Sequence, residues 1–177
     1  MNVPNILIIL RIFLVPIYLI IFFSNIENRV LIAGLVFILA GITDVLDGRI
    51  ARKYNLQTKL GTVLDPFADK LMTFAILISF TYSNLIPPWI LVAIGLKEVL
   101  MIAGGAVLYL SKGNQVLSSN RYGKVATLFF YAATLSIVFR LPDLVSMALF
   151  FLTVILNILA FFNYLQIYLE MRKNLSA

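Results

Sequence analysis

Four aspartates lie close together in a chain that is otherwise strongly apolar. Asp44, Asp47, Asp65 and Asp69, called the acidic cluster below, make up half of the eight acidic residues of the protein. An ionised carboxylate at membrane depth is costly unless it is paired, hydrated or bound to a metal ion, so acids in such a setting indicate a function. The acidic cluster therefore requires cations, and we expect it to be the functional site.

The spacing of the aspartates predicts two helix faces that can converge. Asp44 and Asp47 are three residues apart, Asp65 and Asp69 are four apart, and residues at these separations share one face of a helix. The chain contains no histidine and no cysteine, so its metal ligands have to be oxygen atoms. Carboxylate oxygens suit Mg²⁺ or Mn²⁺. Four negative charges suit two such ions, the arrangement that stabilises the entering and leaving oxygens in displacement at phosphorus.

The composition indicates an all-α integral membrane protein. Of the 177 residues, 62% are hydrophobic and only 12% are charged, which is too little polar surface to cover a water-soluble globule. Apolar runs leave no room for a soluble domain, so we expect a single membrane domain over residues 1–177. The lack of cysteine and histidine excludes disulfides, thiolate chemistry and imidazole catalysis.

Six apolar runs approach the roughly 20 residues that a bilayer requires. The expected transmembrane helices cover residues 5–23, 30–45, 60–82, 89–110, 125–139 and 144–169. Lysine and arginine gather after the second helix, after the fourth helix and in the C-terminal tail, which places these segments in the cytoplasm. The metal site would lie between the second and third helices, facing the cytoplasm. This bias and anionic lipid explain the net charge of +6 without a nucleic-acid partner.

Three residues near the acids admit two interpretations each. Gly48 and Gly61 lie within a turn of a carboxylate, where a missing side chain would let a nucleotide or phosphate approach the backbone. Close packing of helices explains them equally well. Arg52 could clamp a phosphate with its planar guanidinium, or it could be an ordinary arginine at the membrane interface.

The pattern as a whole is more specific than its parts. Asp-x2-Asp-Gly-x2-Ala-Arg-x8-Gly-x3-Asp-x3-Asp is satisfied at every fixed position from Asp44 to Asp69. It resembles the signature of the CDP-alcohol phosphotransferases, integral membrane enzymes of phospholipid head-group synthesis. The resemblance implies that an alcohol hydroxyl attacks the lipid-side phosphorus of a CDP-linked lipid and that CMP leaves.

The resemblance also implies roles for individual residues. The acidic cluster would hold two divalent cations, Mg²⁺ or Mn²⁺, and Asp69 would act as general base as well as ligand. The residues expected to contact the CDP moiety are Asp44, Gly48, Ala51, Arg52 and Gly61. A homodimer is implied by the resemblance alone, as is a bacterial cell membrane as the location.

The acceptor alcohol is indicated by weaker signals. The N-terminal residues Met-Asn-Val-Pro-Asn, followed by Arg11, resemble those of the bacterial phosphatidylglycerophosphate synthases, the subgroup that joins CDP-diacylglycerol to glycerol 3-phosphate. Arg121 and Lys124 fall where the acceptor-phosphate residues of the family lie, although basic residues also anchor helices at lipid headgroups. We expect the chain to transfer a phosphatidyl group from CDP-diacylglycerol to glycerol 3-phosphate.

Departures from that subgroup keep a second acceptor open. Ile8 stands where threonine is expected, Ala126 where a second lysine is expected, and Gly105 where arginine is expected. Each change removes a polar contact. The pair Gly104 and Gly105 resembles the cardiolipin synthases of the same family, which use phosphatidylglycerol as acceptor.

Two other classes of protein fit the sequence less well than an enzyme. An ion-coupled transporter also uses intramembrane carboxylates, but it does not require the glycines and Arg52 at fixed intervals, and the chain has no internal repeat of the kind found in carriers. A non-catalytic membrane scaffold would not explain four costly acids. Lys97 and Glu98, within the fourth apolar run, are part of acceptor binding or a pair that faces a polar cavity.

Overall fold

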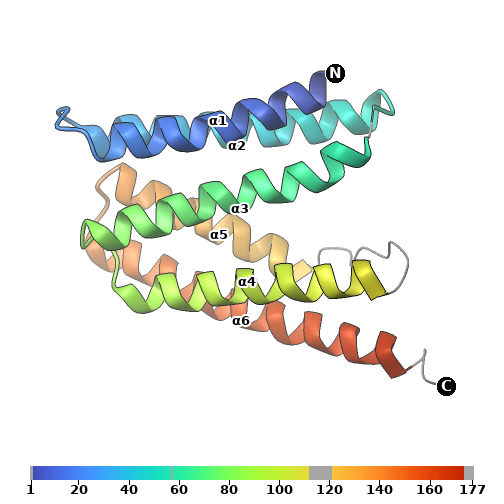
Figure 1. Cartoon of the computed structure of the whole chain (residues 1–177). Coiled ribbons are helices and arrows are strands. Elements are labelled where there is room, and N and C mark those ends of the chain that lie inside the picture. The colour runs from blue at the N-terminus through green and yellow to red at the C-terminus, as the bar shows by residue number, and fades with distance from the viewer. Residues whose placement is uncertain (1, 57, 112–120, 174–177) are drawn as a thin grey trace. The chain divides into compact units, whose positions relative to one another are not determined.

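A computed structural model describes residues 2–56, 58–111 and 121–173, and it is entirely helical over these ranges. Figure 1 shows the helices in chain order. They are α1 (Val3–Phe22), α2 (Arg29–Lys53), α3 (Lys59–Tyr82), α4 (Pro88–Ser111), α5 (Arg121–Val138) and α6 (Asp143–Lys173). Each helix coincides with one of the six predicted apolar runs, so the all-α prediction is confirmed. Lys112, one of the basic residues after the fourth run, lies outside the described residues.

The second helix is longer than its apolar run. The run ends at Val45, whereas α2 continues to Lys53, and the backbone N–H of Tyr54 still bonds to Ile50 O at 3.1 Å. Arg52 and Lys53 in the last turn complement the negative end of the helix dipole. Because the helix passes through the first two aspartates without a break, both project from continuous helical backbone.

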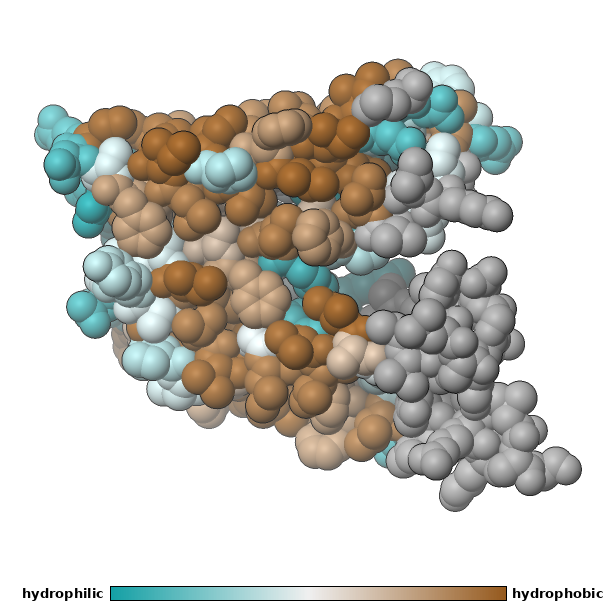
Figure 2. Space-filling view, in the orientation of Figure 1, coloured by the Kyte–Doolittle hydropathy of each residue, from teal (hydrophilic) through white to brown (hydrophobic). Residues whose placement is uncertain are grey.

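Within the part of the chain that the structure describes, three helices are long and apolar enough to cross a membrane. They are α1, α2 and the part of α6 from Asp143 to Gln166. Figure 2 shows hydrophobic side chains along the middle of α1 and α2 and hydrophilic ones near both ends. In contrast, α3 carries Asp65, Asp69 and Lys70 in its first half. The three apolar helices give the chain the character of a membrane protein.

The first 85 residues form a compact unit in which α1 packs against both α2 and α3. The first turns of α1 and α3 meet, as do their last turns, so these two helices run parallel. Tyr18 and Ser79 share a hydrogen bond of 2.8 Å between Oη and Oγ, and the Phe22 ring lies 5.7 Å from that of Tyr18 and 5.8 Å from that of Phe80. This buried aromatic contact fixes the far end of α1 against α3.

Residues 86–177 form a second compact unit in which α6 packs against α4 and α5. Phe130 and Phe150 meet edge to face with ring centroids 6.4 Å apart, and Ser136 Oγ donates a hydrogen bond of 2.9 Å to Ser146 Oγ. Buried hydroxyls paired in this way avoid the cost of an unmatched polar group in an apolar interior. The expectation of a single membrane domain stays a prediction.

Candidate functional site

The first unit brings carboxylates from two helices together. Asp44 and Asp47 on α2 and Asp65 on α3 each offer one oxygen, and these oxygens lie within 4.8 Å of one another. The two aspartates that share one face of α2 therefore lie close to an acid of α3. Oxygens this close, with no nitrogen or sulfur among them, form a ligand set that could hold a hard divalent ion.

Arg11 of α1 lies at the centre of the acidic cluster. Its Nη1 is 2.8 Å from Asp65 Oδ1 and 2.9 Å from Asp44 Oδ1, and its Nη2 donates a hydrogen bond to Asp47 Oδ2. Asp69 Oδ1 is farther away, 3.7 Å from Nη1. The Arg11 side chain is only 1% exposed. One guanidinium thus joins acids from α2 and α3 to α1.

The residue roles predicted from the sequence did not include Arg11. A signal was present, because Arg11 is the single charged residue in α1, whose other residues are almost all apolar. A charged side chain in such a run faces the interior of the bundle and pairs with an opposite charge. The sequence nevertheless gave no partner for it, since Asp47 and Asp65 are 36 and 54 positions away.

The four acids differ in exposure. The Asp47 side chain is 4% exposed, whereas those of Asp44, Asp65 and Asp69 are 34%, 43% and 41% exposed within the protein. Asp47 is therefore the most buried of the four carboxylates, and the other three are exposed enough for an ion or a substrate to reach them.

The start of α3 is tied directly to the start of α1. Thr58 caps α3 by accepting a hydrogen bond of 3.0 Å from the Gly61 backbone N–H, and its hydroxyl donates to Asn5 Oδ1 at 3.0 Å. A Cβ on Gly61 would lie 2.9 Å from Asn5 Oδ1, closer than such atoms approach, and 3.1 Å from Thr58 Oγ1, tighter than most such contacts. An alanine at this position would therefore force the side chains of Asn5 and Thr58 to shift, which favours glycine at the contact between the helices.

Gly48 has a different environment. A Cβ there would meet one described atom within 4 Å, Nη2 of Arg52 at 3.7 Å. Arg52 is exposed, and its Nε donates a hydrogen bond of 3.0 Å to Gly48 O. No described neighbour requires a glycine at this position, and the approach of a ligand to the Gly48 backbone stays a prediction. Ala51, on the same turn, is half-buried.

The residues predicted to bind the acceptor belong to the second unit. Arg121 is the first residue of α5, and Lys124, one turn later, is exposed. Lys97 and Glu98 of α4 form an ion pair with each other, with Nζ 2.8 Å from Oε1 and side chains 11% and 7% exposed. Their pairing satisfies both charges in an apolar helix. The binding roles of Arg121 and Lys124 stay predictions.

Comparison with known proteins identifies relatives over most of the chain. The family model described as CDP-alcohol phosphatidyltransferase matches residues 1–161. A protein of Aquifex aeolicus named CDP-diacylglycerol–glycerol-3-phosphate 3-phosphatidyltransferase is 39% identical over 139 residues, which cover 77% of this chain and 75% of that protein. A Haemophilus influenzae protein of the same name is 31% identical over 174 residues, covering 94% of this chain and 92% of the relative.

A further relative has a different name. A Mycobacterium bovis protein with the provisional name cardiolipin synthase is 35% identical over 130 residues, which cover 73% of this chain and 61% of that protein. The names of these relatives therefore divide between two enzymes.

Proposed function

Since the chain belongs to the CDP-alcohol phosphatidyltransferase family, we propose that it transfers the phosphatidyl group of CDP-diacylglycerol to glycerol 3-phosphate, forming phosphatidylglycerol phosphate and CMP. The observation that carries the proposal is the convergence of Asp44, Asp47 and Asp65, whose oxygens lie within 4.8 Å of one another while Asp44 and Asp65 stay partly exposed. Transfer at phosphorus depends on alignment and charge neutralisation rather than on covalent chemistry by the protein, which suits a chain without cysteine or histidine.

In this proposal the acidic cluster holds two divalent cations, Mg²⁺ or Mn²⁺, which would neutralise the phosphates of the donor. Asp69 is the acid that Arg11 holds least tightly, with 3.7 Å between Oδ1 and Nη1, and its side chain is 41% exposed. A general base has to reach the hydroxyl whose proton it takes. Asp69 is therefore the member of the cluster best suited to accept the proton of the acceptor hydroxyl.

The donor would enter along α2. Gly48 leaves its backbone accessible, and the exposed Arg52 one turn later can place its guanidinium near a phosphate of the CDP moiety. Ala51 and Gly61 are the remaining residues proposed for this contact. The acyl chains of the donor would stay in the bilayer beside the apolar helices.

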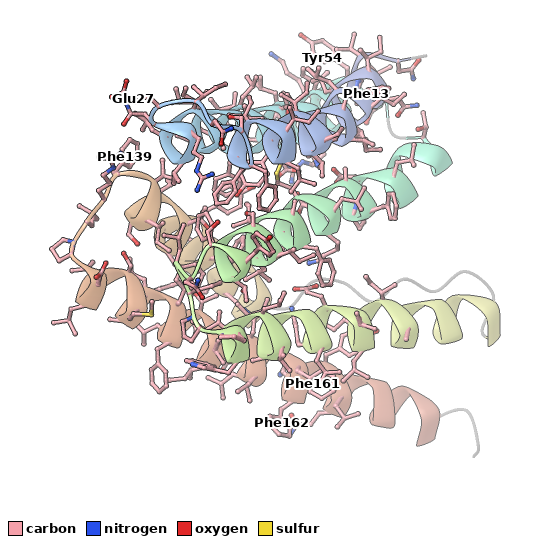
Figure 3. All side chains as sticks on the ribbon, turned by 60° about the vertical axis from the view of Figure 1, so that its left-hand side comes forward. Phe13, Glu27, Tyr54, Phe139, Phe161 and Phe162 are labelled. Atoms are coloured by element: carbon pink, nitrogen blue, oxygen red, sulfur yellow. The ribbon has the colours of Figure 1, made fainter. Side chains whose placement is uncertain are left out.

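The proposed orientation in the membrane is argued from the basic residues at one end of α2. We place all six helices across the bacterial cell membrane as one domain, with the acidic cluster toward the cytoplasm. Asp47 is six residues before the end of α2, or about 9 Å along the helix axis, and that end carries Arg52 and Lys53. Figure 3 labels Tyr54 at this end and Glu27 at the opposite one. The positive-inside rule favours the basic end in the cytoplasm. A homodimer is proposed from the family alone.

A second acceptor is favoured by one specific comparison. The Mycobacterium bovis relative has the name of a cardiolipin synthase, and the resemblance of this chain to that group rests on the pair Gly104 and Gly105. A Cβ on Gly104 would lie 3.6 Å from the Tyr164 ring, an ordinary contact that does not by itself require glycine. Phosphatidylglycerol is therefore kept as the alternative acceptor.

One experiment tests the function and separates the acceptors. The purified protein in detergent micelles receives labelled CDP-diacylglycerol with glycerol 3-phosphate, phosphatidylglycerol, serine or inositol phosphate, with Mn²⁺ or with a chelator. We expect phosphatidylglycerol phosphate and stoichiometric CMP with glycerol 3-phosphate alone, and no product with chelator or with Asp65→Asn. Formation of cardiolipin instead would establish the alternative, and absence of CMP release with every alcohol would refute the enzyme.

A further inference from the structure

We propose that Arg11 is the internal counter-cation of the acidic cluster: it holds the carboxylates in position and competes with divalent ions for the same oxygens. The inference rests on the proposed function in one respect, that the acidic cluster binds divalent ions. It adds a positioning residue on α1, a helix that contributes no acid to the site.

The competition follows from the atoms that Arg11 contacts. A single nitrogen, Nη1, lies 2.9 Å from Asp44 Oδ1 and 2.8 Å from Asp65 Oδ1, which belong to different helices. An Mg²⁺ ion bound to the same two oxygens would be about 2.1 Å from each. The ion and Nη1 would therefore compete for the same two oxygens.

The balance of charge leads to the same result. The four negative charges of the ionised carboxylates exceed the single positive charge of the guanidinium. Arg11 alone therefore leaves the acidic cluster with a net negative charge that attracts cations. Two divalent ions would match the four carboxylates, and a guanidinium kept among them would be repelled. Because a guanidinium keeps its proton in proteins, Arg11 cannot become neutral and has to move away from the ions.

The side chain is held in a way that permits this movement. Its ion pairs are all made by the two terminal nitrogens, while Nε is buried and has no hydrogen-bond partner among the described residues. Once ions take the carboxylate oxygens, no other hydrogen bond or ion pair among the described residues holds the guanidinium in place. Arg11 thus keeps the acids assembled until the ions arrive and gives up its contacts when they bind.

Arg11→Met tests the proposal because methionine keeps much of the length of the side chain and removes the charge. In chelator, this variant should unfold roughly 5–10 °C below the wild type, as expected when a buried ion pair loses one partner. Its Kd for Mn²⁺, measured by the electron paramagnetic resonance signal of free Mn²⁺, should be at least about tenfold lower than that of the wild type, a modest effect for the loss of one nearby charge. Mn²⁺ should also raise its Tm more than it raises that of the wild type.

Arg49→Met is the matched control, since Arg49 is an exposed arginine on α2 close in sequence to the same acids. It should leave Tm and the Kd for Mn²⁺ nearly unchanged. Should Arg11→Met fail to fold in chelator, it can be purified with Mn²⁺ and titrated after dilution. Arg11→Lys supplies a second test, because it keeps the charge without the fork and should give intermediate values of both quantities.

An unchanged or weaker affinity for Mn²⁺ in Arg11→Met would overturn the proposal, because a purely structural arginine would lower Tm without strengthening ion binding. Failure of the wild type to bind Mn²⁺ would overturn both the competition and the proposed metal site. In contrast, tighter Mn²⁺ binding by Arg11→Met together with no transfer to any alcohol by the wild type would support the role of Arg11 and refute only the proposed function.

Discussion

Thr58 and Asn5 are joined by a hydrogen bond of 3.0 Å from Oγ1 to Oδ1, and this bond ties the N-terminus of α3 to the first turn of α1. The same Thr58 oxygen accepts the Gly61 N–H. A polar contact between residues 53 positions apart thus sets where α3 begins. Asp65 follows within two turns, so this contact helps to determine where its carboxylate lies.

Substitution of Thr58 tests this tie. Thr58→Ala should lower the free energy of unfolding by about 1–2 kcal/mol, since it loses a helix cap and a hydrogen bond between helices. Asn5→Ala should cost about 1 kcal/mol, because the cap survives. Thermal unfolding in detergent gives the comparison, with Thr58→Ser, which keeps the hydroxyl, as control. Equal effects of the two alanine variants would show that the helix cap contributes nothing to the free energy of unfolding.

The two glycines of the motif should respond differently to alanine. Gly61→Ala should destabilise the protein by about 1–3 kcal/mol, because its Cβ would overlap Asn5 and Thr58. Gly48→Ala should leave stability unchanged or raise it by up to about 1 kcal/mol, since alanine is the better helix former. If Gly48 admits the donor, the same variant should raise KM for CDP-diacylglycerol.

These effects are separated by measuring unfolding and donor kinetics on the same preparations. A Gly48→Ala protein with normal stability and normal donor KM would show that the CDP moiety does not approach the backbone there.

Asp69→Asn should reduce turnover by about 10²- to 10⁴-fold, the usual contribution of a positioned base. Some affinity for Mn²⁺ and for the donor should remain, because Asp44, Asp47 and Asp65 keep their convergent oxygens. Product formation and Mn²⁺ binding are the two measurements. Asp143→Asn, an exposed acid in the first turn of α6, is the control. A normal rate for Asp69→Asn would exclude the base role.

Lys124→Ala should raise KM for glycerol 3-phosphate roughly tenfold to a hundredfold, as expected for the loss of one hydrogen bond to a charged group. KM for CDP-diacylglycerol should change much less. Steady-state kinetics with each substrate varied in turn give both values, and Lys53→Ala, another exposed lysine, serves as control. A rise confined to the donor KM would mean that Lys124 does not bind the acceptor.

The helices were predictable because the pattern that specifies them is local. Runs of apolar residues near the thickness of a bilayer identify all six. The exception is the end of α2, where Asp44, Asp47 and Arg49 interrupt the hydrophobic pattern although the backbone stays helical. Polar residues that serve a site look like the end of a helix when hydrophobicity alone is the guide.

In the candidate site, too, only the local features were predictable from the sequence. The spacing of the aspartates along each helix fixes which carboxylates share a face, and Asp44, Asp47 and Asp65 do converge. Arg11 and Asn5 could not be assigned, since their partners are tens of residues away and the contacts are tertiary. The contrast between Gly48 and Gly61 was hidden for the same reason, as it depends on whether α1 lies opposite.

The aromatic contact at the far end of α1 has a consequence for the energy stored across the membrane. Moving one elementary charge through 100 mV releases about 2.3 kcal/mol. Acids that exchange protons within a bilayer would therefore let protons cross it unless apolar packing separates these acids from the other side. Beyond Arg11, α1 and α3 bury Tyr18, Phe22 and Phe80 between them, and the Tyr18 hydroxyl is already paired with Ser79. Within the described residues of α1 and α3 no carboxylate lies past that point, so no acid of these two helices could carry a proton toward the far end.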